Sequence, residues 1–123
     1  MSNILIVGIG GAIGAVARYS VDLLVARQFG SNILGTFTVN ITGSLLLGFL
    51  AGLLGTHPTW PIETRMFIAV GILGSFTTFS TLSLATVDLM VKGEILTAMI
   101  NVVTSVLIGV AAAAIGMAAG KAF

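Results

Sequence analysis

The stretch Gly71-Ile-Leu-Gly74-Ser-Phe-Thr-Thr-Phe-Ser-Thr-Leu-Ser83 decides the fold. It places two glycines and six hydroxyl side chains in the middle of an otherwise apolar segment of membrane-spanning length. The hydroxyls belong to Ser75, Thr77, Thr78, Ser80, Thr81 and Ser83. Lipid offers these groups no hydrogen-bond partner, so the run has to face protein, water or an ion. We therefore predict a helix that is broken near Gly74–Thr78 and lines an ion path.

The composition of the whole chain agrees with a membrane location. Of its 123 residues, 57% are hydrophobic and 7% are charged, and the mean hydropathy is +1.16. A soluble domain of this size needs far more charged surface. The absence of cysteine excludes disulfides and thiolate metal sites, and a net charge of +1 gives no basis for binding nucleic acid. We expect an all-α integral membrane protein.

Outward from the central stretch, four apolar segments are each long enough to cross a hydrocarbon core of ~30 Å. They cover residues 3–26, 33–54, 64–91 and 94–120. Residues 28–32 and 55–63 have the glycine, proline and polar content of loops, and residues 92–94 that of a tight turn. Residues 1–123 thus form one four-helix transmembrane domain, with both termini on one side and no room for a soluble domain.

The basic residues give no orientation signal. Arg65 and Lys121 lie on the side of the termini, and Arg27 and Lys92 lie on the other side. Orientation normally follows an excess of lysine and arginine on cytoplasmic loops. The equal count predicts insertion both ways round, which makes an antiparallel homodimer possible. Alternatively, four charges are too few to decide.

Small residues recur every fourth position, a spacing that lets helix backbones approach closely in lipid. The sets are Gly10/Gly14, Ser44/Gly48/Gly52 and Ala112/Gly116/Gly120. Four short helices enclose little interior, so a pore around a single protomer is improbable. We infer an oligomer.

Two charged residues lie inside the first span. Arg18 and Asp22 are four residues apart and share a helix face, which allows a local ion pair. Structural pairing is the favoured role of Asp22. Arg18 could instead attract anions to a pore mouth.

Two further spans carry polar stripes. Thr36 and Asn40 share a face of the second span, where they could line a pore or join helices. The last span has a stripe that is equally open to both interpretations, formed by Asn101, Thr104 and Ser105.

The predicted break has a specific chemistry. Gly71 and Gly74 tolerate unusual backbone geometry, and successive β-branched or hydroxyl residues disfavour a regular helix. Freed carbonyls would suit a cation, and freed amides an anion. Phe79 adds a ring whose electropositive edge can approach an anion. In the simpler alternative, the hydroxyls bond back to their own helix and Phe79 only packs.

Three motifs resemble the small bacterial fluoride channels called Fluc or CrcB proteins, in order and over the whole chain. They are Gly10-Gly11-x-x-Gly14-Ala15-x-x-Arg18-Tyr19, Gly35-Thr36-Phe37-x-Val39-Asn40-x-x-Gly43 and Gly74-x-x-Thr77-Thr78-Phe79-Ser80-Thr81-x-Ser83. The resemblance implies a dual-topology antiparallel homodimer in the bacterial inner membrane. It also implies two fluoride pathways, one on each side of a structural Na⁺.

Specific roles follow from the resemblance alone. The carbonyls of Gly74 and Thr77 would hold Na⁺, with four oxygens from two protomers. Asn40 would donate to fluoride, and Phe79 would be the first of two pore phenylalanines. The remaining positions of the implied pathway are Arg18, Thr36, Ser80, Thr81, Leu82 and Ser105.

Two positions depart from the pattern. Leu82 stands where the family has its second pore phenylalanine, and Ala85 where it has a glutamate. Leucine has the bulk of that ring without its electropositive edge, and alanine removes a carboxylate. Phe76 is no evident substitute.

The sequence therefore predicts a fluoride channel that conducts passively, with the bilayer and a second copy as partners. It has no nucleophile–base pair and no phosphate loop, so we expect no enzyme. Two alternatives stay open. A dual-topology proton-coupled exporter would use Asp22 as its carboxylate, and a structural membrane protein would conduct nothing.

Overall fold

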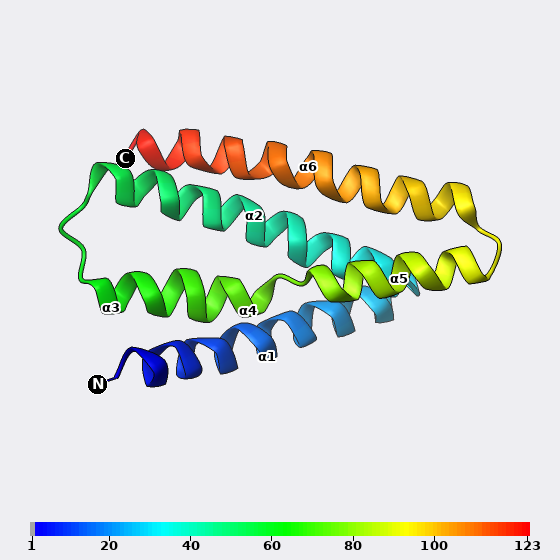
Figure 1. The fold of residues 1–123 in the computed structure, drawn as a ribbon, viewed down its shortest axis with the longest axis horizontal. Helices are drawn as coiled ribbons and strands as arrows, with labels where there is room; N and C mark the ends of the chain where they lie inside the picture. Colours follow the sequence, from blue (N-terminus) through cyan, green and yellow to red (C-terminus); the bar gives the residue numbers. More distant parts are fainter. Residues whose placement is uncertain (1) are drawn as a thin grey trace.

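The computed structural model describes residues 2–123, and every regular element in this range is helical. Four helical spans run back and forth (Figure 1). The elements are α1 (Asn3–Phe29), α2 (Asn32–Thr56), α3 (Ile62–Arg65), the π-helix η1 (Met66–Leu73), α4 (Gly74–Phe76), α5 (Phe79–Val91) and α6 (Ile95–Lys121). The third span, Ile62–Val91, is the one that is divided into several helices.

All four spans have the length and hydropathy of transmembrane helices. They contain 27, 25, 30 and 27 residues, and each has an apolar window. Both termini lie at the same end of the bundle, together with the loop between α2 and α3 (Figure 1). The predicted all-α membrane fold with four spans is confirmed.

The helices extend further than the sequence predicted. α1 continues to Phe29 and α2 begins at Asn32, so only Gly30 and Ser31 join them. Gly30 has a positive φ of 66°, which glycine adopts without strain, and the Ser31 hydroxyl caps α2 by accepting from the Leu34 N–H at 3.3 Å. The second connection is also shorter than predicted and covers residues 57–61.

The connection at residues 57–61 is fastened by Arg65. The Arg65 Nε–H donates to the Trp60 carbonyl at 3.0 Å, and the same guanidinium contacts the Pro58 carbonyl. Arg65 thus satisfies loop carbonyls at the end of the bundle that holds both termini.

Glycines bring non-consecutive spans into backbone contact. α2 packs most extensively along α6, and α1 packs along η1. A Cβ atom on Gly48 would lie 2.1 Å from the Ala113 carbonyl oxygen, and one on Gly116 would lie 2.1 Å from that of Leu45. A Cβ on Gly10 would lie 2.6 Å from the Phe67 carbonyl oxygen. The predicted close packing of these glycines is confirmed, and it joins helices within one protomer.

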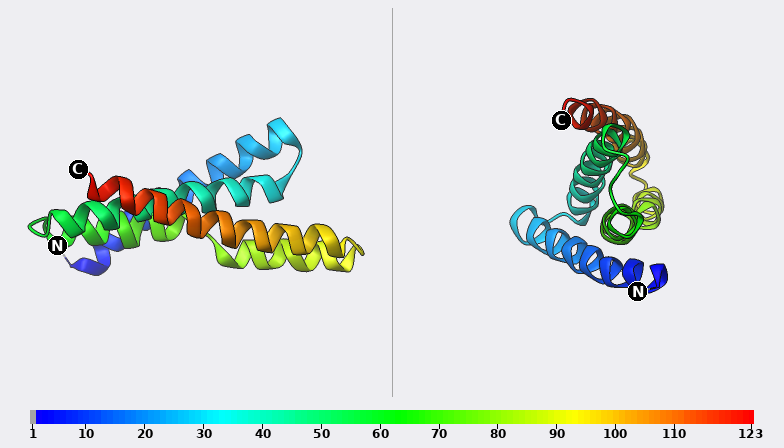
Figure 2. Two further views of the ribbon diagram at one scale, coloured as in Figure 1. Left: turned by 90° about the horizontal axis from the view of Figure 1, so that it is seen from above. Right: turned by 90° about the vertical axis from the view of Figure 1, so that its left-hand side faces the viewer.

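The bundle opens at the end away from the termini. α1 crosses the other spans obliquely, so that the α1–α2 turn and the α5–α6 turn diverge (Figure 2). The outer faces of α1 and α6 are lined by exposed apolar side chains such as Ile9, Val16, Leu107 and Val110. In a transmembrane protein these faces meet lipid or another subunit.

Candidate functional site: the break in the third span

The third span is broken at Thr77 and Thr78, close to its middle residue. Thr77 has φ −83° and ψ 155°, and Thr78 has φ −150° and ψ 116°, so both backbones are extended. The last helical bond before them runs from the Thr77 N–H to the Leu73 carbonyl at 3.2 Å. α5 restarts at Phe79, and the Thr78 hydroxyl caps it by accepting from the Thr81 N–H at 3.2 Å. The predicted break between Gly74 and Thr78 is confirmed.

The side chain of Asn40 on α2 holds this break. Its Oδ1 accepts from the Thr78 N–H at 2.8 Å, and its Nδ2 donates to the Thr78 carbonyl at 3.0 Å. If the carboxamide were flipped, its NH₂ group would face the Thr78 N–H and its oxygen would face the Thr78 carbonyl. The two hydrogen bonds therefore fix its orientation. One Nδ2 hydrogen remains outside this pair of bonds.

The six hydroxyl groups of the central stretch do not behave alike. The hydroxyl of Thr77 donates to the Leu73 carbonyl at 3.2 Å, and that of Ser83 donates to the Phe79 carbonyl at 3.0 Å. The simpler alternative is therefore right for these two side chains. The Thr78 hydroxyl instead joins a small cluster, 3.0 Å from Thr81 Oγ1 and 3.3 Å from Ser80 Oγ.

A groove of about 270 Å³ opens directly beside the break. It gathers side chains from α2, the third span and α6. Its lining residues are Asn40, Gly43, Ser44, Leu47, Thr77, Thr78, Phe79, Leu82, Ser105 and Val106. The lining combines amide and hydroxyl groups with apolar side chains, an environment that can replace part of the water around an ion.

Four of the predicted pathway residues line this groove, namely Asn40, Phe79, Leu82 and Ser105. Ser105 is 7% exposed, and its Oγ is buried without a hydrogen-bond partner in the protomer. A buried hydroxyl with no partner is uncommon and marks a position where a ligand or water can bind. Leu82 is 8% exposed and forms part of the wall.

The other predicted pathway residues lie outside the lining. Ser80 and Thr81 are exposed on the surface next to the break. Thr36 is buried, and its hydroxyl donates to the Asn32 carbonyl of its own helix at 3.2 Å. Arg18 lies on α1, which contributes no residue to the groove.

Sequence reasoning missed several lining residues, of which Gly43 is the most informative. A Cβ atom there would lie 2.2 Å from Thr77 Cγ2 and 3.2 Å from Phe76 Cδ1, so only glycine lets α2 approach the break this closely. The available signal was helical spacing, because residues three, four and seven positions after Asn40 share its face. Those residues are Gly43, Ser44 and Leu47.

One carboxylate oxygen of Asp22 takes no part in the predicted ion pair. Its Oδ1 is buried and has no hydrogen-bond partner, so this oxygen is not paired with Arg18. The neighbouring helix accommodates the carboxylate through Gly35, where a Cβ atom would lie 2.8 Å from that oxygen. Asp22 therefore packs against the start of α2, and it is not among the residues that line the groove.

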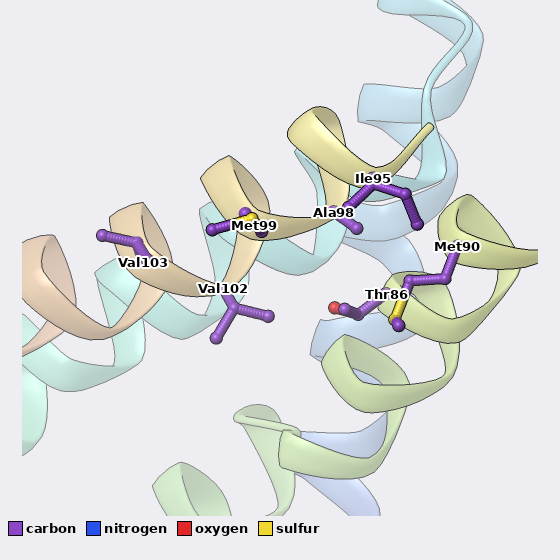
Figure 3. Close-up of a pocket in the computed structure, with 7 residues that line it drawn as sticks. All are labelled: Thr86, Met90, Ile95, Ala98, Met99, Val102 and Val103. Atoms are coloured by element: carbon purple, nitrogen blue, oxygen red, sulfur yellow. The ribbon is translucent and has the colours of Figure 1, made fainter. Parts of the chain in front are cut away.

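A second groove, of about 260 Å³, lies between α5 and α6 (Figure 3). Its lining residues are Thr86, Met90, Ile95, Ala98, Met99, Val102 and Val103. The Thr86 hydroxyl donates to the Leu82 carbonyl at 2.8 Å and accepts a long bond from Asn101 Nδ2 at 3.4 Å. This groove is otherwise apolar and offers an ion little in place of water.

The fold and the break define the class: an all-helical, multi-pass membrane protein whose third span is interrupted at mid-length beside a groove with polar and apolar lining residues. A family model described as CrcB-like protein, Camphor Resistance (CrcB), matches residues 5–117. The chain belongs to this family.

Relatives of similar length carry a more specific name. A protein of Shewanella halifaxensis is 47% identical over 107 residues, which is 86% of each chain. One of Agrobacterium fabrum is 41% identical over 98% of each chain, and one of Methylobacterium nodulans is 40% identical over 100% of this chain and 99% of the relative. All three are named fluoride-specific ion channel FluC. The chain is a multi-pass protein of a bacterial membrane.

Proposed function

We propose that this protein is a fluoride-specific ion channel that lets F⁻ leave the cell passively, down its electrochemical gradient. The observation that carries the proposal is the groove at the break, which Asn40 and Ser105 line at membrane depth. The name shared by relatives that align along nearly the whole chain gives independent support. Such a channel binds and orients an ion and performs no enzymatic reaction.

Fluoride is small and strongly hydrated, so a pore has to replace its water with donors. The Ser105 hydroxyl and the remaining Nδ2 hydrogen of Asn40 are such donors. Phe79 adds a ring edge, and the Ser80 and Thr81 hydroxyls continue the polar surface beyond the groove. A narrow path built from these groups favours fluoride over the larger chloride ion. Thr36 and Arg18 do not line the groove, so any part that they play in the pathway lies outside it.

The functional unit is an antiparallel homodimer. Phe79 is 81% exposed, and Gly74, Ser80 and Thr81 are exposed as well, although they lie near the middle of a membrane span. Polar groups at this depth need a partner other than lipid. A second copy related by a two-fold axis in the membrane plane brings two such surfaces together and yields two pathways, one along each protomer.

The freed carbonyls at the break fit a structural Na⁺ between the protomers. The Thr78 N–H, which would pair with the Gly74 carbonyl in a continuous α-helix, is bonded to Asn40. The Thr81 N–H, which would pair with the Thr77 carbonyl, is bonded to the Thr78 hydroxyl. Carbonyl oxygens suit a hard cation, and two copies supply four of them.

The decisive experiment is fluoride efflux from liposomes reconstituted with the protein, with chloride efflux as the control. We expect fast fluoride loss without chloride loss, and strongly reduced loss for Asn40→Ala. Absence of fluoride efflux from a folded dimer would refute the proposal and favour a structural role. A fluoride flux that requires a proton gradient and disappears in Asp22→Asn would favour the proton-coupled exporter.

A further inference from the structure

Two backbone N–H groups at the break donate to side chains and not to backbone carbonyls. Because of this, the carbonyls of Gly74 and Thr77, which are proposed to bind the cation, have no helical partner. In an α-helix the N–H of residue i+4 pairs with the carbonyl of residue i. The Thr78 N–H is therefore the natural donor to Gly74, and the Thr81 N–H is the natural donor to Thr77. Instead, the Thr78 N–H donates to Asn40 Oδ1 at 2.8 Å, and the Thr81 N–H donates to Thr78 Oγ1 at 3.2 Å.

The first diversion depends on a distant part of the chain. Asn40 lies 38 positions away from Thr78 and on another helix. Gly43, one turn further along α2, is the residue whose missing side chain lets the two segments meet. An N–H that is buried without a hydrogen-bond partner destabilises the folded state. Without the Asn40 oxygen, continuing the α-helix through Thr77 would give the Thr78 N–H the Gly74 carbonyl as its partner.

We propose that Asn40 is a positioning residue for the cation site: by taking the Thr78 N–H, its carboxamide keeps the Gly74 carbonyl free to bind a cation. This inference rests on the proposed function for the presence of the cation. It adds a second role to the side chain, because the same carboxamide has a remaining Nδ2 hydrogen and lines the groove beside the break. The cation site and the anion path then share one side chain.

The alternative is that Asn40 serves only as a hydrogen-bond donor to fluoride. Two substitutions separate the roles. Asn40→Asp keeps an oxygen that accepts from the Thr78 N–H but loses the amide donor, whereas Asn40→Leu has a similar volume and loses both. Both substitutions reduce fluoride efflux under either hypothesis, so efflux alone does not discriminate.

The discriminating measurement is the effect of Na⁺ on thermal unfolding of the full-length protein in detergent. The melting temperature is compared in Na⁺ and in N-methyl-D-glucamine at equal ionic strength. We expect Na⁺ to raise the melting temperature of the wild type and of Asn40→Asp, and to leave that of Asn40→Leu unchanged. A sodium-dependent rise in Asn40→Leu equal to that of the wild type would overturn the inference.

Asn101→Leu is the matched control. Asn101 is a buried asparagine whereas Asn40 is half-buried, and the Asn101 amide bonds to the Thr86 hydroxyl instead of to the break. We expect this variant to melt at a lower temperature while keeping the full sodium-dependent rise. Loss of the rise in the control would show that any lost asparagine abolishes it, which would also overturn the inference.

A second measurement addresses the carbonyl directly and covers the case in which Asn40→Leu does not fold. Labelling with ¹³C′-glycine and ¹⁵N-serine selects Gly74–Ser75 and two other pairs, Gly30–Ser31 and Gly43–Ser44, for solid-state NMR in liposomes. We expect the Gly74 carbonyl shift to respond to Na⁺ in the wild type and in Asn40→Asp. In Asn40→Leu it should take the value of a hydrogen-bonded helical carbonyl.

The outcomes distinguish this inference from the proposed function. If the Gly74 carbonyl shift of the wild type does not change with Na⁺, the sodium site is refuted. The positioning role is then judged by the difference in the Gly74 carbonyl shift between the wild type and Asn40→Leu. An unchanged Gly74 carbonyl in a folded Asn40→Leu refutes the positioning role while fluoride conduction still stands. If Asn40→Leu does not fold, loss of the sodium response in Asn40→Asp refutes it.

Discussion

Ser105 is a residue to which we assign a role in the proposed ion path and none in the stability of the protomer. Its hydroxyl is buried in the groove wall and has no partner in the protomer. Burying a polar group without a hydrogen bond is unfavourable for folding, so its presence needs another reason. The proposed reason is the ion that passes beside it.

We predict that Ser105→Ala lowers fluoride efflux by about tenfold or more, because a hydrogen bond to a charged group contributes ~1.5–3 kcal/mol. The melting temperature should stay the same or rise, since no bond within the protomer is lost. Efflux and thermal unfolding are measured on the same preparation. Thr104→Val is the control, because the Thr104 hydroxyl donates to the Ile100 carbonyl of its own helix at 2.6 Å. A drop in stability without a drop in efflux would contradict the prediction.

Leu82 occupies a position where an aromatic ring could also fit. It is buried, yet its side chain forms one wall of the groove of about 270 Å³, into which a larger side chain can extend. We predict that Leu82→Phe raises fluoride efflux, because the ring edge adds an electropositive group to the path. The cost in unfolding free energy should not exceed the ~1–3 kcal/mol typical of an enlarged buried side chain, because the ring can extend into the groove. Slower efflux from a stable variant would show that leucine is the better lining here.

At the scale of elements, the contact between α2 and α6 depends on the absence of side chains. We predict that Gly116→Ala destabilises the protein by about 1–3 kcal/mol, because its Cβ would meet the Leu45 carbonyl oxygen at 2.1 Å. Gly109→Ala on the same helix is the matched control. Its Cβ would lie 3.7 Å from Ser44 Oγ, an ordinary contact distance. Thermal unfolding in detergent distinguishes them, and equal melting temperatures would contradict the prediction.

The elements were predictable from the sequence where physical chemistry acts locally. Hydropathy predicts the four spans, and the run of hydroxyl groups after Gly74 predicts the break. The π-helix η1 was not predictable, because Met66–Leu73 is apolar on every side and gives no periodicity to read. The bond between Asn40 and Thr78 was missed for a different reason. It joins residues 38 positions apart, and no local pattern reports such a pair.

At the scale of the whole molecule, the equal distribution of basic residues bears on the proposed antiparallel dimer. Arg65 and Lys121 lie at the end of the bundle with the termini, and Arg27 and Lys92 lie at the opposite end. This arrangement supports insertion in both orientations, which an antiparallel dimer requires.

We predict that two arginines added after Phe123 force one orientation and abolish fluoride efflux when this variant is expressed alone. Lysines added at the α5–α6 turn should force the other orientation. Co-expression of the two variants should restore efflux, because each supplies one half of the dimer. Orientation is measured by labelling single cysteines placed at either end of the spans in intact cells. Wild-type labelling from one side only, or full efflux from either biased variant alone, would contradict dual topology.

The pairing of non-consecutive spans also bears on how the protein is made. The main partner of α1 is η1 and the main partner of α2 is α6, so each of the first two spans precedes its partner in the order of synthesis. Asn40 on α2 is synthesised before the Thr78 backbone with which it pairs. The first two spans are therefore made before their main packing partners exist. The last span closes the bundle against α2, so the protomer matures only after the chain is finished.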